Sequence, residues 1–136
     1  MNIKQHGTPV ILIVEAIQGL RDGMKDLLTV DGYRIATAQD GDEAVDAAQR
    51  EQPDLILVCP NDLSPDFLSA SVRIRERAEL GNEVPVVVFS IEAVAEGEEV
   101  AYENHVYVIS PDNFNHLRRF LKCLLDALPS LRPKLA

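Results

Sequence analysis

The sequence predicts an α/β fold, in which a doubly wound parallel sheet of five strands carries five helices on its two faces. Two observations predict this class. Short aliphatic segments alternate along the chain with segments whose apolar residues recur at helical spacing. The aliphatic segments are apolar on both faces, as the central strands of a parallel sheet require. At 136 residues the chain has the length of one domain.

Five aliphatic segments predict the strands, which are expected at residues 10–14, 33–38, 54–59, 86–90 and 106–110. Right-handed crossovers and the common order for five strands give the flavodoxin-like arrangement 2-1-3-4-5. In such a sheet, ligands bind beyond the carboxyl ends of the first and third strands. The functional site is therefore expected around Glu15 and Cys59.

The predicted helices follow the strands. The first ends near Gly32, and its apolar stripe consists of Leu20, Met24, Leu27 and Leu28. Asp40 is expected to cap the second helix, and Pro53 is expected to end it. The remaining three helices are expected at about residues 65–80, 94–104 and 114–128. Gly97 interrupts the fourth helix, at a cost of roughly 1 kcal/mol relative to alanine.

Charge and composition exclude several classes of protein. The formal net charge of −9 argues against nucleic-acid binding, which needs basic side chains opposite the phosphates. No apolar run approaches the roughly 20 residues of a membrane span, so no membrane contact is expected. Two cysteines without metal-ligand spacing predict a cytoplasmic location. Residues 1–9 are interpreted as a leader, 10–128 as one folded domain and 129–136 as a short tail, either a plain terminus or the stub of a linker.

Five segments of the sequence have the order and spacing of a known family, namely "VILIVE", "LLTVDGYRIATAQDGDEAVDAA", "PDLILV", "VPVVVFS" and "YVISP". Over about residues 10–128 the chain resembles the CheY-like receiver domain of two-component response regulators. This resemblance implies phosphorelay signal transduction, with signalling proteins as partners. In that family, an acidic pair after the first strand and an aspartate ending the third hold Mg²⁺. The aspartate accepts a phosphoryl group, and a lysine after the fifth strand neutralises charge.

The chain departs from the family at these chemical positions. The acidic pair is replaced by Glu15 and Ala16, the phosphoacceptor by Cys59, and the lysine by Ser110. A carboxylate forms an acyl phosphate and Mg²⁺ prefers hard oxygen ligands, whereas a thiol is a soft ligand. We therefore expect a degenerate pocket with no metal, no cofactor and no enzymatic activity.

Two other positions match the family. Ser90 stands where a hydroxyl binds a phosphate oxygen, and Tyr107 stands where an aromatic side chain repacks after phosphorylation. Both residues are either vestiges or parts of a two-position switch. Such a switch would need another source of bias, because a ligand shifts populations only through differential affinity.

Charged residues of the predicted fourth and fifth helices indicate an interaction surface, which comprises Glu96, Glu99, Glu103, Arg118, Arg119 and Lys122. An acidic element beside a basic one is self-complementary about a two-fold axis. The surface formed by the fourth helix, fifth strand and fifth helix is therefore expected to form a homodimer or to bind a partner protein. The alternative is a set of scattered exposed charges, each of little energetic value.

The function predicted from the sequence is an atypical receiver domain that binds proteins without being phosphorylated. The alternative is a redox-sensing module that uses Cys59, which is otherwise a small buried hydrophobe. A flavin-binding enzyme of the same fold is disfavoured, because the first strand–helix turn lacks a glycine-rich phosphate-binding segment.

Two further charged groups have simple interpretations. Glu15, Asp62 and Asp66 either gather a weak cation or belong to a solvated acidic loop. The other group consists of Arg73, Arg75 and Arg77. Because glutamates are interspersed among these arginines, we expect an ordinary helix whose charged side chains are solvated.

Overall fold

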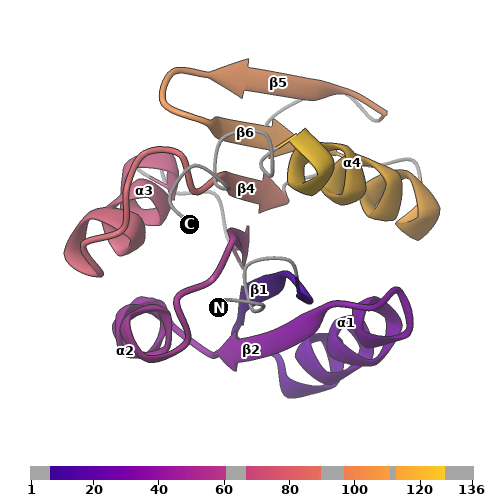
Figure 1. Ribbon diagram of the computed structural model, residues 1–136, viewed down its shortest axis with the longest axis horizontal. Coiled ribbons are helices and arrows are strands. Elements are labelled where there is room, and N and C mark those ends of the chain that lie inside the picture. Colours follow the sequence, from indigo (N-terminus) through magenta and orange to yellow (C-terminus); the bar gives the residue numbers. More distant parts are fainter. Residues whose placement is uncertain (1–6, 61–66, 90–96, 111–112, 128–136) are drawn as a thin grey trace.

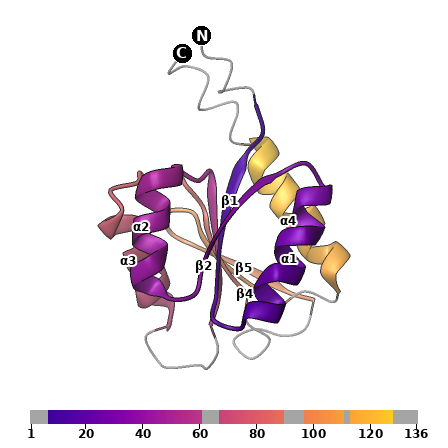
Figure 2. The same ribbon diagram turned by 90° about the horizontal axis from the view of Figure 1, so that it is seen from below.

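The computed structural model describes residues 7–60, 67–89, 97–110 and 113–127. In chain order its elements are β1 (Val10–Glu15), α1 (Gln18–Val30), β2 (Arg34–Ala38), α2 (Gly41–Glu51), β3 (Leu55–Cys59), α3 (Phe67–Arg77), β4 (Val86–Phe89), β5 (Glu99–Tyr102), β6 (Val106–Ile109) and α4 (Phe114–Ala127). They form three layers, with α1 and α4 on one face of the sheet and α2 and α3 on the other (Figures 1 and 2). None of the described helices has the length and apolar character needed to cross a bilayer.

The sheet is doubly wound and has the strand order β2-β1-β3-β4-β6-β5. All neighbours pair in parallel except β5, which pairs antiparallel with β6 at the edge. The α/β class is confirmed, and so is the predicted order of the five parallel strands, because β6 is the strand that was expected fifth. Parallel pairing brings the ends of β1 and β3 together, with Glu15 opposite Cys59.

Alternation along the central strands divides the core between the two faces of the sheet. Leu12 and Ile56 are fully buried on the side of α2 and α3. Ile11 and Leu57, the next residues along the same strands, are fully buried on the side of α1 and α4. Burial on both faces explains why these strands contain almost only aliphatic residues.

The start and the end of α2 follow the predicted signals. Asp40 caps the helix, and its Oδ1 accepts a hydrogen bond from the backbone N–H of Glu43 over 2.9 Å. Glu43 Oε1 in turn accepts one from the backbone N–H of Gln39 over 3.0 Å, which completes a reciprocal cap. The helix ends at Glu51. Its C-cap is Gln52, which has a left-handed φ of 51° and is followed directly by Pro53.

The prediction of a helix at residues 94–104 is wrong for residues 97–104, the part of this range that the structure describes. Residues Glu99–Tyr102 form β5 instead, so the sheet has six strands rather than five, and the described residues form four helices rather than five. Asn104 and His105 have positive φ angles of 60° and 59°, and this backbone turns the chain back so that β5 pairs with β6. Tertiary pairing has overridden the helix propensity of the local glutamates and alanine.

The first helix buries less of its apolar stripe than its spacing suggests. Leu28 is fully buried and Met24 packs at the edge of the core, but Leu20 and Leu27 are 55% and 47% exposed. α1 therefore presents a second, apolar surface to solvent.

The prediction of an ordinary solvated helix is wrong for Arg75 in α3, which is only 1% exposed. Its Nη1 donates hydrogen bonds to the backbone oxygens of Val84 and Asn104, both over 2.8 Å, and to that of Asn82 over 3.3 Å. Burial lowers the pKa of this guanidinium. Arg75 thus connects α3 to the segment before β4 and to the β5–β6 turn.

Replacing Arg75 is expected to destabilise the fold. Arg75→Met keeps much of the aliphatic stem but leaves buried carbonyl oxygens without a donor, so the free energy of unfolding should fall by about 2–3 kcal/mol. Urea denaturation measures this loss. The matched control is Arg73→Met on the exposed side of the same helix, which should change stability by less than about 0.5 kcal/mol. Equal stability of the two variants would contradict the connecting role of Arg75.

Candidate functional site

Two side chains define the expected site at the carboxyl edge of the sheet. Glu15 ends β1 and Cys59 ends β3, and their Cα atoms are partners in the parallel register. Glu15 is only 6% exposed, and Cys59 is half-buried against the core on the side of α1 and α4. Because paired residues of adjacent strands point to the same face, the carboxylate and the thiol are neighbours.

The end of β1 is held by local hydrogen bonds. Glu15 Oε2 accepts a hydrogen bond from the backbone N–H of Ile17 over 3.1 Å. The guanidinium of Arg21 donates to the backbone oxygen of Glu15 over 2.8 Å and to that of Ala16 over 3.4 Å. Arg21 therefore brings a positive charge beside the site, but it binds main-chain oxygens. Sequence reasoning missed Arg21, whose position one helical turn into α1 is the only available signal.

The environment of Cys59 favours the protonated thiol. Burial raises its pKa to about 12, and the nearby charge of Glu15 contributes to the increase. At neutral pH the thiolate, which is the nucleophile and metal ligand, is therefore scarce. This property argues against a reactive cysteine.

The residues of this site do not fit the magnesium ion that the family resemblance implies. Mg²⁺ binds hard oxygen ligands in near-octahedral geometry. Glu15 supplies one carboxylate, Ala16 supplies no side-chain oxygen and Cys59 supplies a protonated thiol. Within the described ranges, no three His, Cys, Asp or Glu side chains are grouped so that they could share a metal ion. Asp62 and Asp66 lie outside the described residues.

Ser110 lies at the same edge, directly after β6. It is buried, its backbone N–H donates to the oxygen of Glu98 over 3.0 Å, and its backbone oxygen accepts from the N–H of Gly97 over 2.6 Å. Its main chain therefore fastens the start of the β5 segment to the end of β6. A hydroxyl at this position carries no charge.

The two switch-like positions are only partly described. Ser90 lies outside the described residues. Tyr107 is half-buried on β6 and packs edge-to-face against Phe120 of α4, with ring centroids 5.7 Å apart. Its hydroxyl lies 3.2 Å from His105 Nδ1. The ring therefore lies between β6 and α4, and its hydroxyl points toward the β5–β6 turn.

The acidic members of the predicted interaction surface are separated. Glu99 on β5 contacts His116 at the start of α4, with 2.7 Å between Oε2 and Nε2. Glu103 lies in the β5–β6 turn, on the side of α3. Glu96 lies outside the described residues.

The basic members lie on α4, and two of them are engaged within the chain. Arg118 forms a two-pronged ion pair with Asp31 after the end of α1, and this contact lowers the pKa of Asp31. Lys122 pairs with Asp126 one turn further along α4, over 3.1 Å. Arg119 is exposed. Two of the three basic members therefore pair with acidic side chains outside the predicted surface, and the surface itself stays a prediction.

An apolar stripe on α1 is the surface feature that sequence reasoning missed. It consists of Ile17, Leu20, Leu27 and Val30, which are four of the five large apolar side chains that are prominently exposed in the described part of the chain. Gly19 and Gly23 lie on the same helix with open space beside them. A partner protein that packed against this helix would remove these side chains from water.

Comparisons with known proteins agree with this fold. The sequence model of the response regulator receiver domain family matches residues 11–109 of this chain. Response regulator MprA of Mycolicibacterium vanbaalenii is 28% identical over 80 residues, which are 59% of this chain and 33% of that protein. Transcriptional regulatory protein PrrA of Mycobacterium tuberculosis is 28% identical over 120 residues, which are 87% of this chain and 50% of that protein. The chain thus spans a third to a half of the length of these relatives.

Solved structures show the same architecture. The receiver domain of a Pseudomonas aeruginosa sensor histidine kinase, determined with magnesium in its active-site cleft, has a TM-score of 0.65 at 25% identity and covers 88% of this chain and 99% of its own. The chemotaxis protein CheY4 of Vibrio cholerae has a TM-score of 0.65 at 21% identity, with coverage of 87% and 99%.

The raised pKa of Cys59 predicts slow alkylation and a loss of stability in alkali. In the unfolded chain the thiol titrates near its ordinary pKa of about 8.5, whereas in the folded protein it titrates near 12. Between these values only the unfolded chain releases the proton, so this contribution to stability is complete below about pH 8.5 and is lost as the pH rises toward 12.

Mass spectrometry of single-cysteine variants checks the first effect, with iodoacetamide labelling Cys59 at least roughly ten-fold more slowly than the exposed Cys123. Urea denaturation of the wild type and Cys59→Ala across this pH range checks the second. Equal labelling rates, or the same pH dependence in both proteins, would show that Cys59 is not shielded.

Proposed function

Because the chain belongs to the response regulator receiver domain family, we propose that it is a degenerate receiver that binds signalling proteins without being phosphorylated. One observation carries this proposal. A protonated thiol at the end of β3 faces the single carboxylate at the end of β1, at the place where ligands bind in this fold. Cys59 then occupies the position of the family's phosphoacceptor aspartate.

The chemistry of phosphoryl transfer supports this conclusion. The reaction depends on a positioned nucleophile and on positive charge that offsets charge building on the transferred group. The raised pKa of Cys59 favours the protonated thiol, and Ser110 stands in place of the lysine. The described part of the site offers too few oxygens for Mg²⁺. The nearby Arg21 is engaged with main-chain oxygens. No observation favours the redox alternative, which the raised pKa of Cys59 opposes.

Protein binding is the function left to such a domain, and the apolar stripe on α1 supports it. We assign the main partner surface to this stripe, because the charges of Glu99, Arg118 and Lys122 are satisfied within the chain. The homodimer through the charged face stays a prediction. The elements of this face are β5, β6 and α4, because the structure has a strand where the fourth helix was expected. We further propose a cytoplasmic location and no enzymatic activity.

The phosphorylation test uses a small phosphodonor. Incubation with acetyl phosphate and Mg²⁺ should leave the mass of the protein unchanged, and beryllofluoride should leave its amide NMR spectrum unchanged. Cys59→Asp alone should not restore phosphorylation, because Ala16 and Ser110 still supply neither a metal ligand nor a cation. A receiver that is known to accept phosphate is the positive control. A stable increase of one phosphoryl group in the wild type would refute the proposal.

The surface test compares charge-inserting variants. Leu27→Glu places a carboxylate in the α1 stripe and should weaken binding of a purified signalling partner at least roughly ten-fold, whereas Arg119→Glu on α4 should leave it unchanged. Calorimetry with a partner first identified from host extract measures both affinities. If Arg119→Glu weakened partner binding and Leu27→Glu did not, the partner surface would be the charged face instead of the α1 stripe. Salt-dependent dimerisation in sedimentation experiments would support the homodimer.

A further inference from the structure

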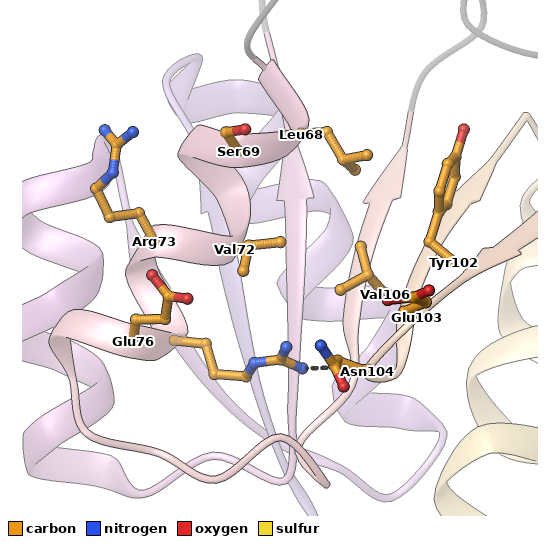
Figure 3. Close-up of a pocket in the computed structure, with 10 residues that line it drawn as sticks. Leu68, Ser69, Val72, Arg73, Glu76, Tyr102, Glu103, Asn104 and Val106 are labelled. Atoms are coloured by element: carbon orange, nitrogen blue, oxygen red, sulfur yellow. Dashed lines mark hydrogen bonds between the residues drawn. The ribbon is translucent and has the colours of Figure 1, made fainter.

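A groove of about 550 Å³ lies between α3 and the β5–β6 hairpin, on the opposite side of the sheet from α1 (Figure 3). Its apolar lining comes from both walls. Leu68 and Val72 project from α3, whereas Tyr102 and Val106 project from β5 and β6. Tyr102 is 48% exposed, which makes it the only prominently exposed large apolar residue in the described part of the chain outside the α1 stripe.

The groove lies beside β5, a strand that the usual five-stranded order of this fold does not contain. β4 and β6 are adjacent parallel strands, and such a pair is normally joined by a right-handed crossover through a helix packed on the sheet. Here β5 extends the sheet beyond β6 instead. No described helix covers the α3 side of β6 and β5 (Figures 1 and 2). Among the described residues, this surface of the sheet therefore stays uncovered.

The walls of the groove are fixed in position by Arg75. This buried guanidinium lines the groove and donates a hydrogen bond from α3 to the backbone oxygen of Asn104 in the β5–β6 turn, over 2.8 Å. The same group binds the oxygen of Val84. Because both walls are connected before any ligand arrives, binding would require little rearrangement of the main chain.

The edges of the groove carry charge. Glu76 lies on the α3 side and Glu103 on the hairpin side, and Arg73 lies further along α3 (Figure 3). The whole chain has a formal net charge of −9. Arg73 and Arg75 balance the two carboxylates within the lining, so the long-range attraction for a positively charged ligand comes from the whole chain. Close to the groove, such a ligand meets a carboxylate on each side.

We propose that this groove binds an amphipathic helix of a partner protein, with an apolar stripe against Val72, Tyr102 and Val106 and basic side chains near Glu76 and Glu103. An α-helix with side chains is about 10–12 Å across, so one helix could pack on the part of the sheet that no described helix covers. A second copy of this chain is a poorer occupant, because two highly negative molecules would bring these carboxylates together. The inference is independent of whether Cys59 accepts phosphate.

The test uses a synthetic amphipathic peptide of leucine and lysine and a matched peptide in which glutamate replaces every lysine. In NMR titrations of the full chain, the lysine peptide should shift the amide signals of Val72, Tyr102 and Val106 in a saturable manner. The glutamate peptide should bind at least roughly ten-fold more weakly. Val72→Glu should weaken binding of the lysine peptide by a similar factor, and Leu27→Glu on α1 should not. Circular dichroism verifies that both variants are folded.

Four outcomes would overturn the inference. They are equal binding of the two peptides, unchanged binding by Val72→Glu, shifts that map to α1, and the absence of saturable binding. Self-association of the wild type that Val72→Glu abolishes would instead identify a second copy as the occupant. Since Leu27→Glu marks the α1 surface and Val72→Glu marks the groove, failure at one surface is distinguishable from failure at the other.

Discussion

The parallel pairing of β1 with β3 is the constraint on which the account depends. Its register places Glu15 opposite Cys59 at the carboxyl edge of the sheet, so the two residues share one small, largely buried volume. Buried carboxylate and thiol together favour the protonated thiol, because a second negative charge there would be neither solvated nor paired. The fold is that of a receiver, and the described residues at this edge contain no group of three side chains that could hold a metal ion.

Much of this arrangement was predictable from periodicity and composition. The aliphatic segments predict the parallel strands, and the usual order for such a sheet brings Glu15 and Cys59 together, as the structure confirms. The strand β5 was not predictable, because its stability comes from pairing with β6 and from left-handed backbone at Asn104 and His105. Local residues alone favour a helix there.

The environments of individual side chains were harder to predict. The burial of Arg75 depends on main-chain oxygens of three residues in two distant segments, Asn82, Val84 and Asn104, and nothing in the charge pattern of α3 indicates them. The exposure of Leu20 could not be predicted, because helical spacing alone does not identify which apolar positions of a helix face the sheet. Both side-chain environments belong to the proposed binding surfaces, one on α1 and one between α3 and the hairpin.

The most direct test of the central claim is a titration of the protein with MgCl₂, followed through the backbone amides of Ala16 and Cys59 by NMR. The described side chains at this edge offer too few oxygens to replace the hydration shell of Mg²⁺. Only small, linear shifts that do not saturate at millimolar concentrations are therefore expected. Saturable shifts of both amides with a dissociation constant in or below the low millimolar range would contradict it.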